Sequence, residues 1–207
     1  MSFSVNTNNA SNVALQYLSA TQGQLDQTQS RINSGLKVAN ARDDGAVYAI
    51  AQNQRGAVAG YTSVINSINN GTSSIDVALS AGQSISDLLI QLKQKALSAA
   101  DSSLDTASRQ ALNANFTALR DQITTIVKNA VFNGFNLVDG STSQVTALAS
   151  ADGTRRITTS AQNMKLSGSI VTLKSTATVS TQAKASALVA TIQTSLTNVN
   201  AALAKLS

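Results

Sequence analysis

The amino-acid sequence predicts a mainly α-helical fold, an elongated antiparallel helical bundle that carries a small β-hairpin. Aromatic residues make up only 3% of the chain and proline is absent, so a core would be built mostly from Ala, Leu, Ile and Val, which suits long packed helices. Apolar residues recur at alternating spacings of four and three over much of the chain, as in a helix that packs along another helix. Between two such stretches the composition changes to Thr, Ser, Val and Gly, which favours strands and turns.

Residues 1–40 predict a first helix made to pack against other protein. Its seam positions repeat at coiled-coil spacing: Ala14, Leu18, Thr21, Leu25, Thr28 and Ile32. Asp26 is the single charged residue in the first three blocks of the sequence, whereas a helix with a face in water ordinarily carries charges there. Gly35 can end the helix, because glycine tolerates a left-handed backbone. The same composition is also typical of a polar tail that is disordered when the chain is alone.

Residues 41–132 predict the two helices of a rod. A single helix from about Asp44 to about Ala100 would extend roughly 80 Å, which is too long to bury its seam inside a compact ball. The seam positions expected to pack in the rod are Ile68, Ile75, Ile85, Leu89 and Leu92. A break in the pattern then allows a shorter antiparallel helix, for which Asp105 or Thr106 can serve as the N-cap.

Residues 133–181 predict a β-rich insert. Two candidate strands, 144–150 and 155–161, are separated by an Asp-Gly pair, which is a strong hairpin signal. A further candidate strand covers residues 165–174, so the insert is expected to contain two to four strands.

Residues 182–207 predict the start of a C-terminal helix that returns along the rod. Its apolar stripe contains Leu188, Ile192, Val199 and Leu206. With the two helices of residues 41–132, this helix would complete a bundle in which the seams face one another.

The residue inventory argues against an enzyme. The chain has no Cys, His or Trp, and all ten of its acids are aspartates. Acid/base catalysis near neutral pH depends mostly on His or on a tuned carboxylate, and soft metal ions prefer Cys and His. We therefore expect no catalytic residue, no cofactor site and no metal site.

The charge pattern argues against a nucleic-acid partner, and the hydropathy pattern argues against a membrane partner. The net charge is +5, but the basic residues are scattered singly, and Arg155-Arg156 is the one adjacent pair. A nucleic-acid surface normally needs a cluster of basic residues. No apolar run is long enough to span a bilayer, and residues 1–10 lack the features of a cleaved signal peptide.

Several motifs resemble those of one protein family. Residues 30–44 contain, in order, an arginine, a Ser-Gly pair, a lysine, alanines and an Asp-Asp pair, and this order resembles the signature of bacterial flagellins. Residues 4–8 resemble the N-terminal motif of that family, and residues 131–134 resemble the Phe-Asn-Gly that follows its shorter helix. Residues 88–100 are similar to flagellins of alphaproteobacterial type. Together these motifs are distributed over almost the entire chain.

The resemblance implies a structural protein. It implies that residues 1–40 form a filament-core helix, with the helical rod and its hairpin outside that core. The expected function is that of a subunit of the bacterial flagellar filament, a secreted, extracellular organelle of motility. The subunit would leave the cell through the flagellar type III apparatus and self-assemble by packing of helix seams. Expected partners are other flagellin subunits in a homo-oligomeric filament, an export chaperone and hook-associated proteins.

The subunit-packing residues expected from this reasoning lie in the first helix and in the motif after it: Ala14, Leu18, Leu25, Ile32, Arg31, Asp43 and Asp44. Arg31 and Arg42 are expected to form interhelical or intersubunit ion pairs. Their candidate partners are Asp26, Asp43 and Asp44. Adjacent acids at the start of a long helix are favoured by capping and by the helix dipole, so we interpret Asp43 and Asp44 as structural rather than catalytic.

Two alternatives remain open at the level of sequence. The resemblance implies a second core helix that pairs with the first, whereas the sequence ends at Ser207 inside the expected return helix, as a truncated form or a short paralogue would.

The second hypothesis for function is an extracellular flagellin-like module that binds an acidic polymer such as a polysaccharide.

Overall fold

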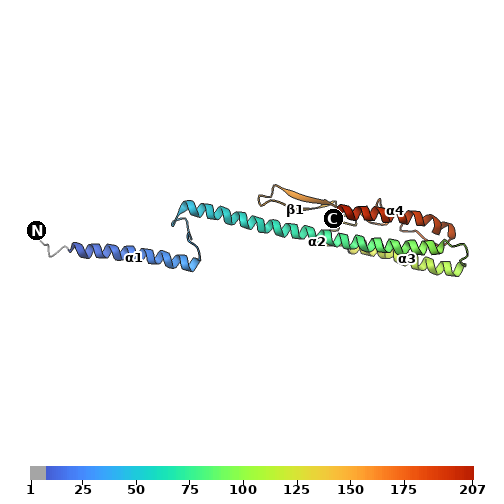
Figure 1. The fold of residues 1–207 in the computed structure, drawn as a ribbon, viewed down its shortest axis with the longest axis horizontal. Helices are drawn as coiled ribbons and strands as arrows, with labels where there is room; N and C mark the ends of the chain where they lie inside the picture. The colour runs from blue at the N-terminus through green and yellow to red at the C-terminus, as the bar shows by residue number, and fades with distance from the viewer. Residues whose placement is uncertain (1–7) are drawn as a thin grey trace. The chain divides into compact units, whose positions relative to one another are not determined.

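The computed structural model describes residues 8–207, which fall into two compact units with their boundary between Ala59 and Gly60. This part of the chain contains four helices and one hairpin, which are labelled along the ribbon in Figure 1. The predicted N-terminal motif at residues 4–7 lies outside the described residues. The mainly helical fold class with a small hairpin is confirmed.

Helix α1 spans Asn9–Ser34 and has a capping residue at each end. The Asn8 side chain accepts a hydrogen bond from the Ser11 backbone N–H at 3.2 Å, which satisfies one of the free donors of the first turn. Gly35 ends the helix with a φ of 65°, and its N–H bonds to the Ile32 carbonyl. The expected glycine stop is therefore confirmed, because this left-handed backbone strains residues that carry a Cβ.

Helix α2 spans Gly45–Ala99, close to the limits that the apolar spacing predicts. At its start, the Asp44 carboxylate accepts a hydrogen bond from the Val47 N–H at 3.0 Å, as expected for an N-terminal cap. The Asp43 carboxylate instead accepts from the Ala39 N–H at 3.2 Å and so fixes the loop before the helix.

The core lies within residues 60–207, where α2 packs with α3 (Thr106–Asn129) and α4 (Gln182–Leu206). Asp105 caps α3 by accepting from the Ser108 N–H at 2.8 Å, as predicted. Two polar contacts give the direction of α4. Ser86 of α2 bonds to Asn200, and Lys93 of α2 bonds to Gln193. Since the later residue of α2 meets the earlier residue of α4, the two helices run antiparallel.

Three glycines of α2, spaced eleven residues apart, allow other segments to approach the helix closely. A Cβ at Gly60 would lie 2.8 Å from the Cβ of Ala151, one at Gly71 would lie 3.3 Å from the Cβ of Ala147, and one at Gly82 would lie 2.5 Å from a Leu203 methyl. Eleven residues are about three helical turns, so these positions share one side of the helix. This side seats the hairpin and the end of α4.

The hairpin pairs β1 (Gln144–Leu148) with β2 (Arg156–Ser160) in antiparallel register. Gly153 in the connecting turn has a φ of 72°, which explains the Asp-Gly pair in the sequence. Ser67 of α2 accepts a hydrogen bond from the Leu148 N–H at 2.9 Å. The predicted hairpin is confirmed, and this contact attaches β1 to α2.

The prediction of a further strand at residues 165–174 is wrong. This segment folds back on itself, with the Ser167 N–H bonded to the Leu173 carbonyl at 2.8 Å and a single bridge between Leu166 and Val171. Ser167 has a φ of 65°, which interrupts an extended chain. Val171 is buried in the core. This position is apolar because it packs in the core, and not because it belongs to a strand. Among the described residues the sheet has two strands.

Candidate functional site

The most unusual surface of the molecule is the set of apolar side chains in residues 8–59. No residue of this stretch is buried within the chain. Leu18 is 61% exposed and Ile32 is 73% exposed. Ten large apolar residues are exposed here: Val13, Leu15, Tyr17, Leu18, Leu25, Ile32, Leu36, Val47, Ile50 and Val58. Single exposed apolar residues are ordinary, but a long series of them indicates a surface that another molecule covers.

The helical spacing places these side chains on more than one side of α1. Leu18, Leu25 and Ile32 lie seven residues apart and so form one stripe along the helix. Tyr17 precedes Leu18 by one residue and therefore lies about 100° around the axis. Val13 lies four residues before Tyr17 and shares its side of the helix. The exposed apolar surface is thus broad enough to meet more than one neighbouring helix.

The structure places the expected packing residues of α1 at the surface. Ala14, Leu18, Leu25 and Ile32 are all exposed in the single chain. Whether they pack between subunits stays a prediction. Arg31 is partly buried, and its Nε atom is buried without a hydrogen-bond partner.

The ion pairs expected for Arg31 and Arg42 do not form within residues 8–207. Among residues 8–207 the one ion pair joins Arg120 to Asp121 at 2.8 Å. Asp43 and Asp44 instead bind backbone N–H groups of the loop and of the first turn of α2. The intramolecular form of the expectation is therefore wrong, because the Asp43 and Asp44 carboxylates bind backbone N–H groups and Asp26 forms no ion pair within residues 8–207. An intersubunit ion pair of Arg31 or Arg42 stays a prediction.

The expected rod positions differ from one another in burial. Ile85, Leu89 and Leu92 are fully buried in the core, and Ile75 is partly buried against it. Ile68 is 37% exposed, so its expected packing in the seam is not found in the single chain. The hairpin strands β1 and β2, and not a helix, lie against this part of α2. They leave a narrow groove lined by these residues: Ile68, Gly71, Thr72, Ile75, Val145, Ala147, Ile157 and Thr159.

Sequence reasoning missed the polar side chains that attach the insert to α3. Arg120 is 9% exposed, donates to the Ala177 carbonyl at 2.7 Å and makes two further bonds to Asp121. Buried Asn136 donates to the Val127 carbonyl at 2.7 Å. Asn113 accepts from the Val179 N–H at 2.8 Å. Apolar spacing contains no signal for such residues, since their partners are backbone groups of distant segments.

The carboxylates with shifted pKa values accept hydrogen bonds from nearby serine and threonine residues, and Asp105 does so as the N-cap of α3. Hydrogen bonds from the backbone and side chain of Ser108 hold the pKa of Asp105 below its ordinary value. The pKa of Asp101 is lowered in the same way by Ser103. No cluster of metal-ligating side chains exists within residues 8–207. No helix in the described part of the chain is sufficiently long and apolar to cross a membrane.

Comparison with known proteins decides the family. Residues 5–143 match the model of the bacterial flagellin N-terminal helical region. The chain belongs to the bacterial flagellin family. Flagellin FljK of Caulobacter vibrioides is 45% identical over 203 residues, which are 98% of this chain and 73% of that protein. Flagellin A of Rhizobium meliloti is 33% identical over 133 residues, 64% of this chain and 33% of that protein.

A solved structure supports the flagellin fold independently. The crystal structure of Bacillus cereus flagellin superposes with a TM-score of 0.60 at 22% identity, covering 69% of this chain and 81% of that one. At that identity the likeness concerns the fold alone.

The relatives confirm the prediction of an alphaproteobacterial-type flagellin. The chain is thus a structural subunit of the flagellar filament, the extracellular organelle of motility, and assembles with other flagellin subunits.

Proposed function

We propose that the exposed apolar side chains of residues 8–59 form the surface through which copies of this chain pack together in the filament. The observation that carries this proposal is that a stretch with ten exposed large apolar residues contains no fully buried residue. Burial of apolar surface is the dominant favourable term in most protein association. Head-to-tail contacts that do not close on themselves then generate a helical filament.

The energetics favour assembly in which many contacts form together. Covering a half-exposed Leu or Ile contributes about 1 kcal/mol. Association costs about 4 to 15 kcal/mol in lost translational and rotational freedom. Two or three newly covered side chains cannot offset this cost, whereas ten on each subunit can. The subunit would therefore add stably only at sites where it meets several neighbours at once.

The same surface has consequences before assembly. A chain with this much exposed apolar area is prone to associate non-specifically, so an export chaperone that covers it inside the cell is part of the proposal. Type III export and contact with hook-associated proteins complete the expected route. The role is noncatalytic, consistent with the absence of His and Cys from the sequence and with the local hydrogen bonds that engage Asp101 and Asp152 in turns and Asp105 at the start of α3.

Charge substitutions on the α1 stripe test the proposal. Leu18→Asp and Leu25→Asp should each abolish or strongly reduce filament formation, because a carboxylate buried in an apolar contact lacks a partner. Gln16→Asp is the matched control, since Gln16 is exposed and lies about 180° around the helix from Leu25 and about 60° from Val13. Sedimentation and electron microscopy of the purified chain under precipitating salt measure assembly. Filaments of normal length from Leu18→Asp and Leu25→Asp would refute the proposed surface.

A further inference from the structure

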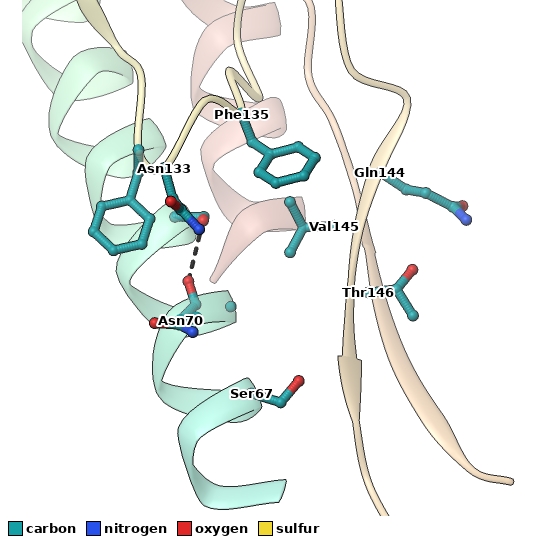
Figure 2. A pocket seen from close by; sticks show the side chains of 10 residues that line it. Ser67, Asn70, Asn133, Phe135, Gln144, Val145 and Thr146 are labelled. Carbon is teal, nitrogen blue, oxygen red and sulfur yellow. Dashed lines mark hydrogen bonds between the residues drawn. The ribbon is translucent and has the colours of Figure 1, made fainter. Parts of the chain in front are cut away.

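A pocket of about 380 Å³ opens between α2, the turn at residues 132–135 and β1. Figure 2 shows α2 on one side, β1 on the other and the turn above. Ten residues line it: Ser67, Asn70, Gly71, Ser74, Phe132, Asn133, Phe135, Gln144, Val145 and Thr146. None of these is charged.

The turn holds its aromatic and amide side chains in a fixed arrangement. Phe132 and Phe135 exchange two backbone hydrogen bonds of 2.9 Å. Between them, Asn133 and Gly134 have φ values of 47° and 83°, as in a tight type I′ turn. The paired residues Phe132 and Phe135 therefore project from the same face of the turn. Figure 2 shows Asn133 directed towards Asn70 of α2, and Phe135 beside Val145 of β1.

Two side-chain amides are available to a ligand. None of the hydrogen bonds among residues 8–207 engages the side chain of Asn70 or Asn133, and both residues are exposed. Each amide offers one acceptor and two donor hydrogens. The Ser67 hydroxyl accepts from the Leu148 N–H and keeps its own hydrogen for donation. These groups come from two separate segments and converge on one space.

The free edge of β1 adds backbone groups to the same wall. The Ala149 N–H donates to the Arg155 carbonyl, and the Ala161 N–H donates to the Ser143 carbonyl. The backbone N–H and C=O groups of the odd-numbered residues of β1 therefore point towards β2. The N–H and C=O groups of Gln144 and Thr146 consequently point to the outer edge. Their side chains lie on the face of β1 opposite Val145, as Figure 2 shows. The pocket thus meets these two residues through their backbone.

This chemistry selects the ligand class. Amides, a hydroxyl and backbone groups suit a ligand with many hydroxyl groups, and a phenyl ring covers the apolar C–H face of a sugar ring. The uncharged lining gives an acidic or basic ligand no partner. An added peptide strand requires a run of free edge positions, whereas only Gln144 and Thr146 are available before Ser67 engages Leu148. We propose that this pocket binds a neutral carbohydrate of one or two sugar units.

The test is an amide NMR titration of the full chain at a concentration where it is monomeric, so the result does not depend on filament assembly. The probes are maltose, cellobiose and N,N′-diacetylchitobiose as neutral disaccharides, and an unsaturated digalacturonate as the acidic comparison. We expect at least one neutral disaccharide to shift the amide signals of Asn70, Phe135, Gln144 and Thr146, with saturation, and the acidic one to leave them unchanged.

Two substitutions and a control separate binding from folding. Asn133→Gly keeps the left-handed turn and removes the amide, and Phe135→Ala removes a ring that is 51% exposed. Each should weaken binding about tenfold, the loss expected for one polar or stacking contact. Tyr61→Ala, which removes an exposed aromatic ring outside the pocket, should leave the affinity unchanged.

Three results would overturn the proposal. The first is the absence of shifts at the pocket with every neutral disaccharide up to tens of millimolar. The second is stronger binding of the acidic disaccharide. The third is equal affinity of Asn133→Gly, Phe135→Ala and the unmodified chain. None of these results would affect the proposed packing of residues 8–59.

Discussion

Residues 8–59 and residues 60–207 follow the same helical spacing of apolar residues but use it differently. In the second region α2, α3 and α4 bury Leu89, Ile123 and Ile192 completely against one another. In the first region Leu18, Leu25 and Ile32 have the same spacing and remain exposed. Spacing therefore predicts that a helix has an apolar seam, but it does not show whether the partner helix belongs to the same chain. That difference separates the self-contained folded part from the part that depends on neighbours.

The largest expected effect comes from placing a charge in each seam in turn. Leu89→Asp should destabilise residues 60–207 by at least about 4 kcal/mol, because an unpaired carboxylate would be forced into the core. Leu18→Asp should change the stability of the monomer by less than about 0.5 kcal/mol, as at other exposed sites. Urea denaturation of the monomeric chain measures both. Equal losses would show that α1 has a partner within its own chain.

The next effect concerns the buried arginine of the second region. Arg120→Ala should cost about 3 kcal/mol, because it removes packing and leaves the Ala177 carbonyl without its donor. Asp121→Asn is the control. The Asp121 side chain is 65% exposed, and loss of its charge should cost about 1 kcal/mol or less. The difference between the two variants in the same denaturation assay measures how much the attachment of the insert depends on Arg120. If the two losses were equal, the stabilising contact would be the ion pair instead.

Two glycines of α2, one in each region, differ in the space around them. Gly82→Ala should destabilise the second region by about 1 kcal/mol, because overpacking against Leu203 and Met164 outweighs the gain in helix propensity. Gly56→Ala should instead stabilise the helix locally by about 0.5 to 1 kcal/mol and so increase helix content, since nothing lies within 4 Å of the added Cβ. Circular dichroism and thermal melting report both changes. Stabilisation by Gly82→Ala would show that the end of α4 is not seated there.

The smallest effect is a loss of stability in acid that arises in the second region. The pKa of Asp105 in the folded chain lies below the ordinary value of 3.8. As the pH falls, the unfolded chain therefore binds its proton first, so the stabilisation is fully present above that value and is lost as the pH falls from it through the lower pKa of the folded chain. The lowered pKa values of Asp101, Asp139 and Asp152 have the same sign. Asp105→Asn keeps an N-cap without a titrating group, so it should flatten the dependence of unfolding on pH below about 4. An unchanged acid profile would contradict the cap assignment.

The fold was largely predictable because its elements have local signals. The limits of α2 follow from the apolar spacing, the end of α1 follows from Gly35, and the hairpin follows from its Asp-Gly turn. The predicted strand at residues 165–174 failed because alternating apolar residues also occur in a loop that folds back into a core. Arg120 was missed because its partner is a carbonyl distant in the sequence.

The candidate assembly surface was predictable only in part. The apolar positions and the low charge of α1 can be read from the sequence, and its motifs indicate the family. The role of Asp44 as a cap was predicted, whereas Asp43 binds the loop before α2 and no ion pair of either residue was found among residues 8–207. Exposure of Ile68 could not be predicted, because it depends on a hairpin that occupies the place of a helix.

Hydrogen–deuterium exchange can distinguish residues 8–59, which depend on other subunits for stability, from residues 60–207, which are stabilised by their own core. In dilute monomer, backbone amides of α1 should exchange nearly as fast as in an unfolded chain, since no residue of α1 is buried. Amides of α2 around Ile85 and Leu89 should be strongly protected. In assembled filaments both sets should be protected. Protection of α1 in dilute monomer equal to that of α2 around Leu89 would contradict the account.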